Sequence, residues 1–324
     1  MIEKGVWPER LGSFFIVLFA LLPPVYIEVP QQNMSAWTAV MVFAGFLGII
    51  LLYTKVNIFV KAIAFGGYIN CFLSAAPIIS FTSYLPLLFC CYFYLLCTKI
   101  KDWKLIFNVL FTILLLECLF MIMQIFGKDP LLNFGFGGKN CYGTIGNKMQ
   151  LESFIVVVSV LALQGRRKIV LAVVLATATL YTIIYGFHIH IHSSFTGRMV
   201  VWVEAFKMSN WHPFVGWGIG TFKFMFTPLT KLIIPGQNFS AMHNEWLQVF
   251  FETGYPGLIL MVSLFSFLTY RLIKIRKWLL LAGLLALSLD MSVHFPLRTL
   301  QCPLIVIAFL AFLEQNLLSV IKKV

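Results

Sequence analysis

Residues 104–126 read KLIFNVLFTILLLECLFMIMQIF, and this stretch decides the class of fold. After Lys104 its only charged side chain is Glu117. A helix needs roughly 20 mostly apolar residues to cross the hydrocarbon core of a bilayer, and it satisfies its own backbone hydrogen bonds there. The stretch therefore predicts a membrane-spanning helix.

Comparable stretches recur along the chain, which is 60% hydrophobic and 11% charged. A soluble domain carries about a quarter charged residues. We expect an all-α integral membrane protein with about ten transmembrane helices, forming a single domain over residues 1–324. The predicted spans lie near residues 11–30, 36–53, 56–76, 84–98, 104–126, 149–164, 168–187, 255–272, 278–293 and 301–318.

The basic residues predict the orientation of these helices. Most of the 24 Lys and Arg side chains fall at alternate ends of the predicted spans, as Lys101, Arg166 and Lys322 do. Because basic residues favour the cytoplasmic side, both termini are expected there, and residues 127–148 and 188–254 on the outer face. The formal charge of +12 is then mainly a topology signal. Nucleic acid is not an expected partner, because the basic residues are dispersed among short loops.

The sequence offers little for a metal site. The seven cysteines lie mostly within predicted spans and lack metal-ligand spacing, which argues against a zinc site or a disulfide framework. His188, His190 and His192 alternate and would share one face of an extended segment, yet no carboxylate or cysteine joins them. We interpret them as a boundary segment at headgroup depth and expect no metal.

The large loop, residues 188–254, has enough polar side chains to build a site. Within it Val201, Trp202 and Ala205 recur at helical spacing, and Arg198 lies four residues before Trp202 on the same face. This predicts a short helix near the membrane surface. The pair is either an interfacial anchor or a guanidinium over an indole, directed at a phosphate.

A glycine-rich run follows, HPFVGWGIGTF at residues 212–222. Gly216, Gly218 and Gly220 resemble a dinucleotide fingerprint only superficially, because that fingerprint requires a strand before the glycines and a helix after them. Two readings stay open. The run is a flexible turn, or its backbone approaches a substrate closely.

Residues 243–253 predict a second short helix, with an apolar stripe that ends at Gly254. His243 lies at its start. A helix N-terminus disfavours the imidazolium, so this side chain is expected to be neutral and able to accept a proton from a hydroxyl. The alternative is that His243 caps the helix, with Asn244 acting similarly.

Charged residues within predicted spans, Lys61, Glu117 and Glu152, are costly in lipid and usually face a cavity or a partner. Glu152 lies one turn after Lys148. We favour an ion pair between these two over a proton-relay role for Glu152.

Several of these features occur together in the order known for one family. The set is Gly146-Asn147, Gly197-Arg198 with Trp202, Gly216 to Phe222, and His243-Asn244 with Glu252, Gly254 and Gly257. In this order, on the outer side of a polytopic protein, it resembles the O-antigen ligase and O-antigen polymerase superfamily. The resemblance covers roughly residues 137 to 265.

The resemblance implies a metal-independent, cofactor-free, inverting glycosyltransferase in the bacterial inner membrane, with its active site periplasmic. Its donor is a glycan on undecaprenyl diphosphate, and its acceptor is a sugar hydroxyl of a glycan or of lipid A core. Polysaccharide assembly proteins are implied partners. His243 is then the general base and Arg198 binds the diphosphate. The other implied substrate-binding residues are Trp202, Asn244, Asn147, Lys148, Gly216, Gly218, Gly220, Glu252 and Arg298.

Two departures from the family pattern bear on this reading. Members usually carry a second arginine between the Gly-Asn span and the main loop, and no outward-facing one lies between Asn147 and Arg198. Lys148, Lys139 and Arg298 are candidate substitutes, with Lys148 favoured. The other departure is Gly-Asn-Lys-Met in place of Gly-Asn-Pro-Asn. A transporter of lipid-linked glycans and a non-catalytic assembly scaffold remain alternatives, and ligase is not separated from polymerase.

Overall fold

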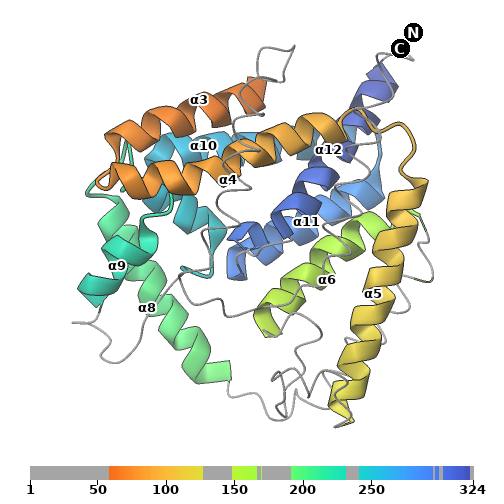
Figure 1. The fold of residues 1–324 in the computed structure, drawn as a ribbon, viewed down its shortest axis with the longest axis horizontal. Coiled ribbons are helices and arrows are strands. Elements are labelled where there is room, and N and C mark those ends of the chain that lie inside the picture. Colours follow the sequence, from red (N-terminus) through yellow and green to blue (C-terminus); the bar gives the residue numbers. More distant parts are fainter. Residues whose placement is uncertain are drawn as a thin grey trace.

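The computed structural model describes residues 58–126, 148–165, 169, 191–230, 241–294, 296–298 and 302–321. Within these ranges the chain forms helices and no strand, which confirms the all-α prediction for this part of the chain (Figure 1). The elements are α3 (Ile58–Leu73), α4 (Pro77–Cys97), α5 (Lys104–Ile125), α6 (Lys148–Ala162), α8 (Ile191–Ser209), α9 (Phe222–Thr230), α10 (Glu245–Lys274), α11 (Trp278–Val293), the 3₁₀ turn η3 (Pro296–Arg298) and α12 (Cys302–Ile321).

Three described helices are long and apolar enough to cross a membrane: Ile79–Cys97, Lys104–Gln124 and Glu245–Lys274. Shorter apolar helices cover Ile58–Leu73, Leu151–Ala162, Trp278–Val293 and Cys302–Leu318. The chain is therefore a membrane protein. The predicted spans at 11–30, 36–53 and 168–187 lie outside the described residues, so the count of about ten stays a prediction.

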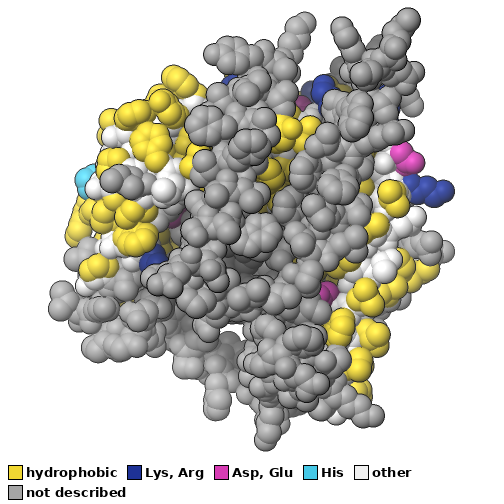
Figure 2. All heavy atoms as spheres, viewed as in Figure 1, with side chains coloured by type: hydrophobic (Ala, Val, Ile, Leu, Met, Phe, Trp, Pro, Cys, Tyr) yellow, Lys and Arg dark blue, Asp and Glu magenta, His cyan; other side chains and the backbone are white. Residues whose placement is uncertain are grey.

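The helices α6, α11 and α12 share one large apolar core with α4, α5 and α10. In Figure 1, α8 and α9 lie at one side of this core and α5 at the other. Many apolar side chains nevertheless face outward, including Phe65 and Phe72 on α3 and Leu116 and Leu119 on α5. Figure 2 shows such side chains at the surface over α3, α4 and α5. Exposed apolar surface of this extent is what contact with lipid requires.

Helix α4 begins at Pro77, well before the apolar window predicted from residue 84. Its first turns carry hydroxyl side chains, which lower the apparent hydropathy. These groups are satisfied inside the protein: the Ser80 hydroxyl donates to Ser74 Oγ at 2.7 Å. A hydropathy window cannot anticipate such pairing, because it counts a polar side chain as a cost.

Helix α10 is broken at Gly254, where φ is 67° and ψ is −165°. The prediction of a short helix that stops at this glycine is therefore confirmed, although the chain resumes helical geometry immediately afterwards. The glycine-rich turn packs against the break: the Trp217 and Gly218 amides donate to the carbonyls of Phe251 and Glu252 at 2.9 Å each. This turn caps the first part of α10 and fixes the direction in which the second part enters the core.

Candidate functional site

Three segments meet where α8, the start of α10 and the end of α11 come together, and each pair of segments is joined by a hydrogen bond. The Trp202 indole of α8 donates to the Met242 carbonyl at 2.8 Å. The Leu297 amide, beyond α11, donates to Glu245 Oε1 of α10 at 3.0 Å. Arg198 Nη1 of α8 donates to the Val293 carbonyl of α11 at 3.3 Å. These bonds hold the side chains of three basic residues in one region.

The first of these residues, His243, has a φ of 54°, a left-handed conformation that is uncommon outside glycine. Hydrogen bonds of the adjacent residues hold the backbone of His243 in this conformation. The Met242 amide donates to Gln248 Oε1 at 3.1 Å, and its carbonyl accepts from Trp202. Asn244 Oδ1 accepts from the Leu247 amide at 3.0 Å. A strained residue over-determined by its surroundings is typical of functional sites.

The chemical state of His243 agrees with the prediction of a neutral imidazole. Burial, followed by the nearby positive charges of Arg198 and His294, lowers its pKa from 6.5 to about 4. Of the capping alternative, the part that concerns Asn244 is confirmed: Asn244 is the N-cap of α10 and its side chain accepts the capping hydrogen bond, with His243 one residue before it.

Arg198, the second basic residue, lies on α8 one turn before Trp202. Its side chain reaches the end of α11 at Val293, whereas that of Trp202 reaches Met242, directly before His243. Burial lowers the pKa of the guanidinium, and the negative charge of Glu152 opposes that effect. An arginine stays charged under all ordinary conditions, so it provides a fixed positive charge in this region.

The third basic residue, His294, was not singled out by the sequence analysis. It follows the last residue of α11, and its Nδ1 lies 2.7 Å from Oδ1 of Asp290. Its Nε2 lies 3.4 Å from Oε2 of Glu152 on α6. A usable signal was present: an aspartate inside an apolar span, with a histidine one turn later at the helix end.

The two carboxylates reverse the effect of burial on His294. Burial lowers its pKa, but hydrogen bonds to Asp290 and Glu152 and their negative charges outweigh this and raise it to about 9. The C-terminal end of α11 also favours a cation. The site therefore combines one neutral imidazole with two positive charges.

Glu152 pairs with His294 in the structure, and the ion pair with Lys148 that the sequence analysis favoured stays a prediction. Lys148 is the first residue of α6, and the position of its side chain lies outside the description, as do Asn147 and the Arg298 side chain. Their predicted substrate-binding roles stay predictions. The same holds for His188 and His190, whereas the backbone of His192 is helical in α8 rather than extended.

The glycine-rich turn and Glu252 lie away from the three basic residues. A Cβ on Gly216 would meet the Glu252 carbonyl carbon at 2.4 Å, and one on Gly218 would meet Ser74 Oγ at 1.9 Å. Asn70 of α3 binds the turn from the other side: its Nδ2 donates to the Val215 carbonyl at 2.6 Å, and its Oδ1 accepts from the Ile219 amide at 3.0 Å. Packing of the turn thus accounts for the close backbone approach at Gly216 and Gly218.

Glu252 is connected to the site indirectly. Its Oε1 accepts from Gln248 Nε2 at 3.1 Å, and Gln248 in turn accepts from the Met242 amide. Both side chains are buried. Glu252 therefore orients Gln248, which holds the backbone directly before His243.

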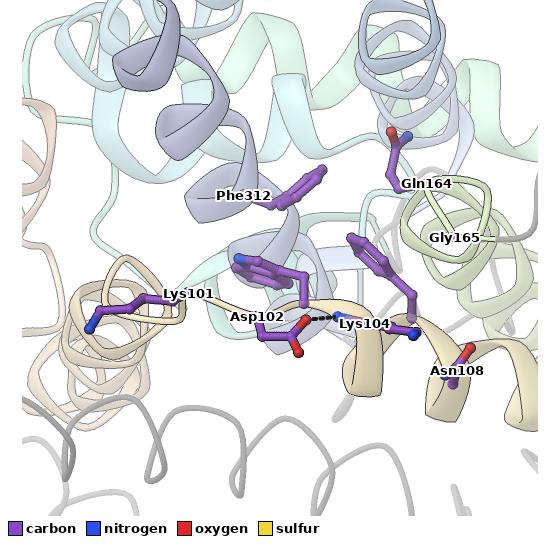
Figure 3. A pocket seen from close by; sticks show the side chains of 9 residues that line it. Lys101, Asp102, Lys104, Asn108, Gln164, Gly165 and Phe312 are labelled. Atoms are coloured by element: carbon purple, nitrogen blue, oxygen red, sulfur yellow. Dashed lines mark hydrogen bonds between the residues drawn. The ribbon is translucent and has the colours of Figure 1, made fainter. Parts of the chain in front are cut away.

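The structure also contains an open pocket at the other end of α6, near the turn between α4 and α5 (Figure 3). Lys101, Asp102, Gln164 and Phe312 line it, and Asp102 Oδ1 accepts from the backbone amide of Lys104 at 2.8 Å. None of the predicted site residues belongs to it. The candidate active site is therefore the neutral His243 with the nearby cations Arg198 and His294, and not this pocket.

These observations define the class of the protein. It is a helical membrane protein with a basic site where α8, the start of α10 and the end of α11 meet. The O-antigen ligase family matches residues 150–262 of the chain. This match confirms the resemblance to the O-antigen ligase and polymerase superfamily, and it supports a general role in polysaccharide assembly. None of the curated proteins matches the chain. The matched stretch includes Glu152, Arg198 and His243, and it ends before His294 and Asp290.

Proposed function

We propose that the protein is an inverting glycosyltransferase that moves a glycan from undecaprenyl diphosphate to an acceptor sugar hydroxyl, as an O-antigen ligase or polysaccharide polymerase does. The observation that carries this proposal is the neutral His243 held beside the charged Arg198 and His294. The reaction needs a proton acceptor and a stabilised anionic leaving group in one place.

His243 is the proposed general base. The acceptor hydroxyl gives its proton to the imidazole while its oxygen attacks the anomeric carbon of the donor sugar. The bond from that carbon to the diphosphate breaks on the opposite face, and the configuration inverts. A base with a pKa of about 4 is unprotonated at neutral pH, so it does not have to be activated by losing a proton first.

Arg198 is the proposed diphosphate ligand. The diphosphate gains negative charge as the glycosidic bond breaks, and a guanidinium can hold two phosphate oxygens at once. The half-buried position of Arg198 strengthens this interaction, because the dielectric is lower than in water. Trp202 and Asn244 position the site in this proposal: the indole ties α8 to Met242, and the amide of Asn244 starts the helix that follows His243.

The proposed setting is the periplasmic face of the bacterial inner membrane, with both termini cytoplasmic and residues 188–254 as the catalytic loop of a single domain. Support comes from the distribution of basic residues along the sequence. Lys148, Asn147 and Arg298 are proposed as further donor contacts, and lipid A core or a growing glycan as acceptor. No metal or other cofactor takes part in this mechanism.

The deciding experiment follows a labelled undecaprenyl-diphosphate-linked oligosaccharide incubated with purified protein and either lipid A core or a second lipid-linked glycan. We expect the label to move to one of these acceptors with inverted anomeric configuration, observed by NMR, and equally well in EDTA. Transport of the donor across liposomes without transfer to any acceptor would contradict the proposal and favour a flippase. Neither transfer nor transport would favour an assembly scaffold.

A further inference from the structure

His294 lies between two carboxylates that differ in distance and accessibility. The Asp290 side chain is 4% exposed, lies 2.7 Å from Nδ1, and also accepts from the Ser153 hydroxyl at 3.2 Å. The Glu152 side chain is 42% exposed and lies 3.4 Å from Nε2. A charge-assisted hydrogen bond is about 2.7–2.9 Å long, so only the contact with Asp290 has that length. Asp290 is the fixed partner of His294, and Glu152 is the one that can leave.

Glu152 also acts on Arg198, since its negative charge raises the pKa of the guanidinium. The carboxylate is thus shared by two cations that stand on different helices. Arg198 donates to the carbonyl of Val293, directly before His294, which keeps the two cations close together. An anion placed between them interacts with both.

We propose that Glu152 occupies the place of a donor phosphate in the unliganded protein, and that the diphosphate displaces it and binds His294 together with Arg198. This inference rests on the proposed function and deepens it. His294 becomes the second phosphate-binding cation, and Glu152 becomes an internal competitor of the donor.

The charges of the site support this exchange. With Glu152 in place, Arg198 and His294 are balanced by two carboxylates. Once Glu152 swings out, one of those negative charges leaves and the diphosphate supplies at least two. Asp290 stays and keeps His294 oriented. Two other described groups lie in the site and do not compete for this role: His243 is neutral, and Glu245 accepts from the Leu297 amide.

The test measures the dissociation constant of farnesyl diphosphate by calorimetry on the purified full-length protein at pH 6.0. At this pH even an unperturbed histidine, with a pKa of about 6.5, is mostly protonated. We expect Glu152→Gln to bind the probe roughly 3- to 10-fold more tightly, because a competing charge is gone. His294→Gln should bind it at least ~10-fold more weakly, because a charge-assisted bond is lost.

Glu204→Gln is the matched control for the change in charge. Glu204 lies on α8 and pairs with the exposed Lys207 at 2.7 Å, so its removal alters the net charge equally without touching His294. We expect its dissociation constant to stay within about 2-fold of wild type. Inorganic pyrophosphate is the second probe. If the site recognises the diphosphate, the variants should rank in the same order of affinity for pyrophosphate. If binding comes from the prenyl chain, their affinities for pyrophosphate should not differ.

Unchanged or weaker binding by Glu152→Gln overturns the proposal, and so does unchanged binding by His294→Gln. Folding of each variant is checked by its melting temperature, and Glu152→Asp, with a shorter reach, carries the same expectation if the Gln variant does not fold. The proposed function is judged separately by transfer. If no assay detects transfer but the expected binding changes are observed, the proposed enzymatic activity is contradicted and the proposed anion site is still supported.

Discussion

Two imidazoles in one site have pKa values displaced in opposite directions, and their neighbours explain the difference. His243 is buried beside positive charges, which lowers its pKa to about 4. His294 is buried beside Asp290 and Glu152, which raises its pKa to about 9. The separation of acid and base character comes from the neighbours and not from the residue type.

The pH dependence of transfer follows from these values. Activity should fall as the pH drops toward 4, because His243 becomes protonated and no longer accepts a proton. It should also fall as the pH rises through about 9, because His294 loses its charge. We therefore expect a plateau between these limits in initial rates measured at fixed donor concentration. His294→Gln should lower the plateau and remove the alkaline limb, and an unaltered alkaline limb would contradict the assignment.

His243→Asn separates a base from a structural residue. Asn tolerates the left-handed backbone at this position, and Asn244 continues to cap the helix, so the melting temperature should stay near that of wild type. Transfer should fall roughly 100-fold or more, the usual scale of general base catalysis. Binding of donor should persist. Transfer by this variant at close to the wild-type rate would refute the base role.

Arg198→Lys tests the shape of the cation, since lysine keeps the charge and loses the planar fork. We expect transfer to fall at least ~10-fold, and further for Arg198→Ala, because a charge-assisted bond to phosphate contributes about 1.5–3 kcal/mol. Arg271→Lys is a suitable control, because Arg271 lies in the last turn of α10, far along the chain from the site. Wild-type rates for Arg198→Ala would reduce this residue to an interfacial anchor.

At the scale of elements, the glycine-rich turn and the break in α10 form one unit. Gly216 has a φ of 70°, and an added Cβ would meet the backbone of Glu252 and Thr253 at 2.4–2.5 Å. Because neither neighbour is a flexible side-chain end, relief requires movement of α10. Such a movement would carry Gln248 and the backbone before His243 with it.

Gly216→Ala should accordingly destabilise the protein by about 1–3 kcal/mol or more, seen as a lower melting temperature in detergent. Gly66→Ala is the matched control, since Gly66 lies within α3 and its added Cβ would have no neighbour within 4 Å. In a helix this change should be neutral or stabilising by up to ~1 kcal/mol. Equal melting temperatures for the two variants would show that the turn does not constrain α10.

At the scale of the whole molecule, the orientation predicted from the basic residues puts the candidate site on the outer side of the membrane and the pocket of Figure 3, which includes Lys101, on the cytoplasmic side. Single cysteines at the exposed Asn210 and Lys101 test this. In intact spheroplasts, an impermeant thiol reagent should label Asn210→Cys and not Lys101→Cys, and both should react after permeabilisation. Labelling of Lys101→Cys alone would show that the orientation is the reverse of the predicted one, and it would contradict a periplasmic position of the site. Ser209 is unsuitable for this purpose because it is buried.

The sequence by itself determined the class of fold. In lipid, backbone hydrogen bonds must be satisfied within the protein, so a long apolar stretch such as 104–126 forms an α-helix. The sequence also predicted the helix stop at Gly254, since glycine at a helix end acts locally. It predicted a neutral His243 as well, from the helix N-terminus, whereas in the structure burial and the charges of Arg198 and His294 lower its pKa.

The tertiary structure alone decided which side chains share the site. Glu152 on α6 lies far in sequence from Asp290 and His294 at the end of α11, and its contact with His294 depends on how α6 and α11 pack. Packing likewise gave the glycines of residues 216–220 a structural role, and it brought Glu152 to His294, a partner that the sequence analysis did not predict. Charges perturb one another through space, so the pKa of His294 depends on Glu152 as well as on Asp290 one turn earlier, and no local pattern encodes the contact with Glu152.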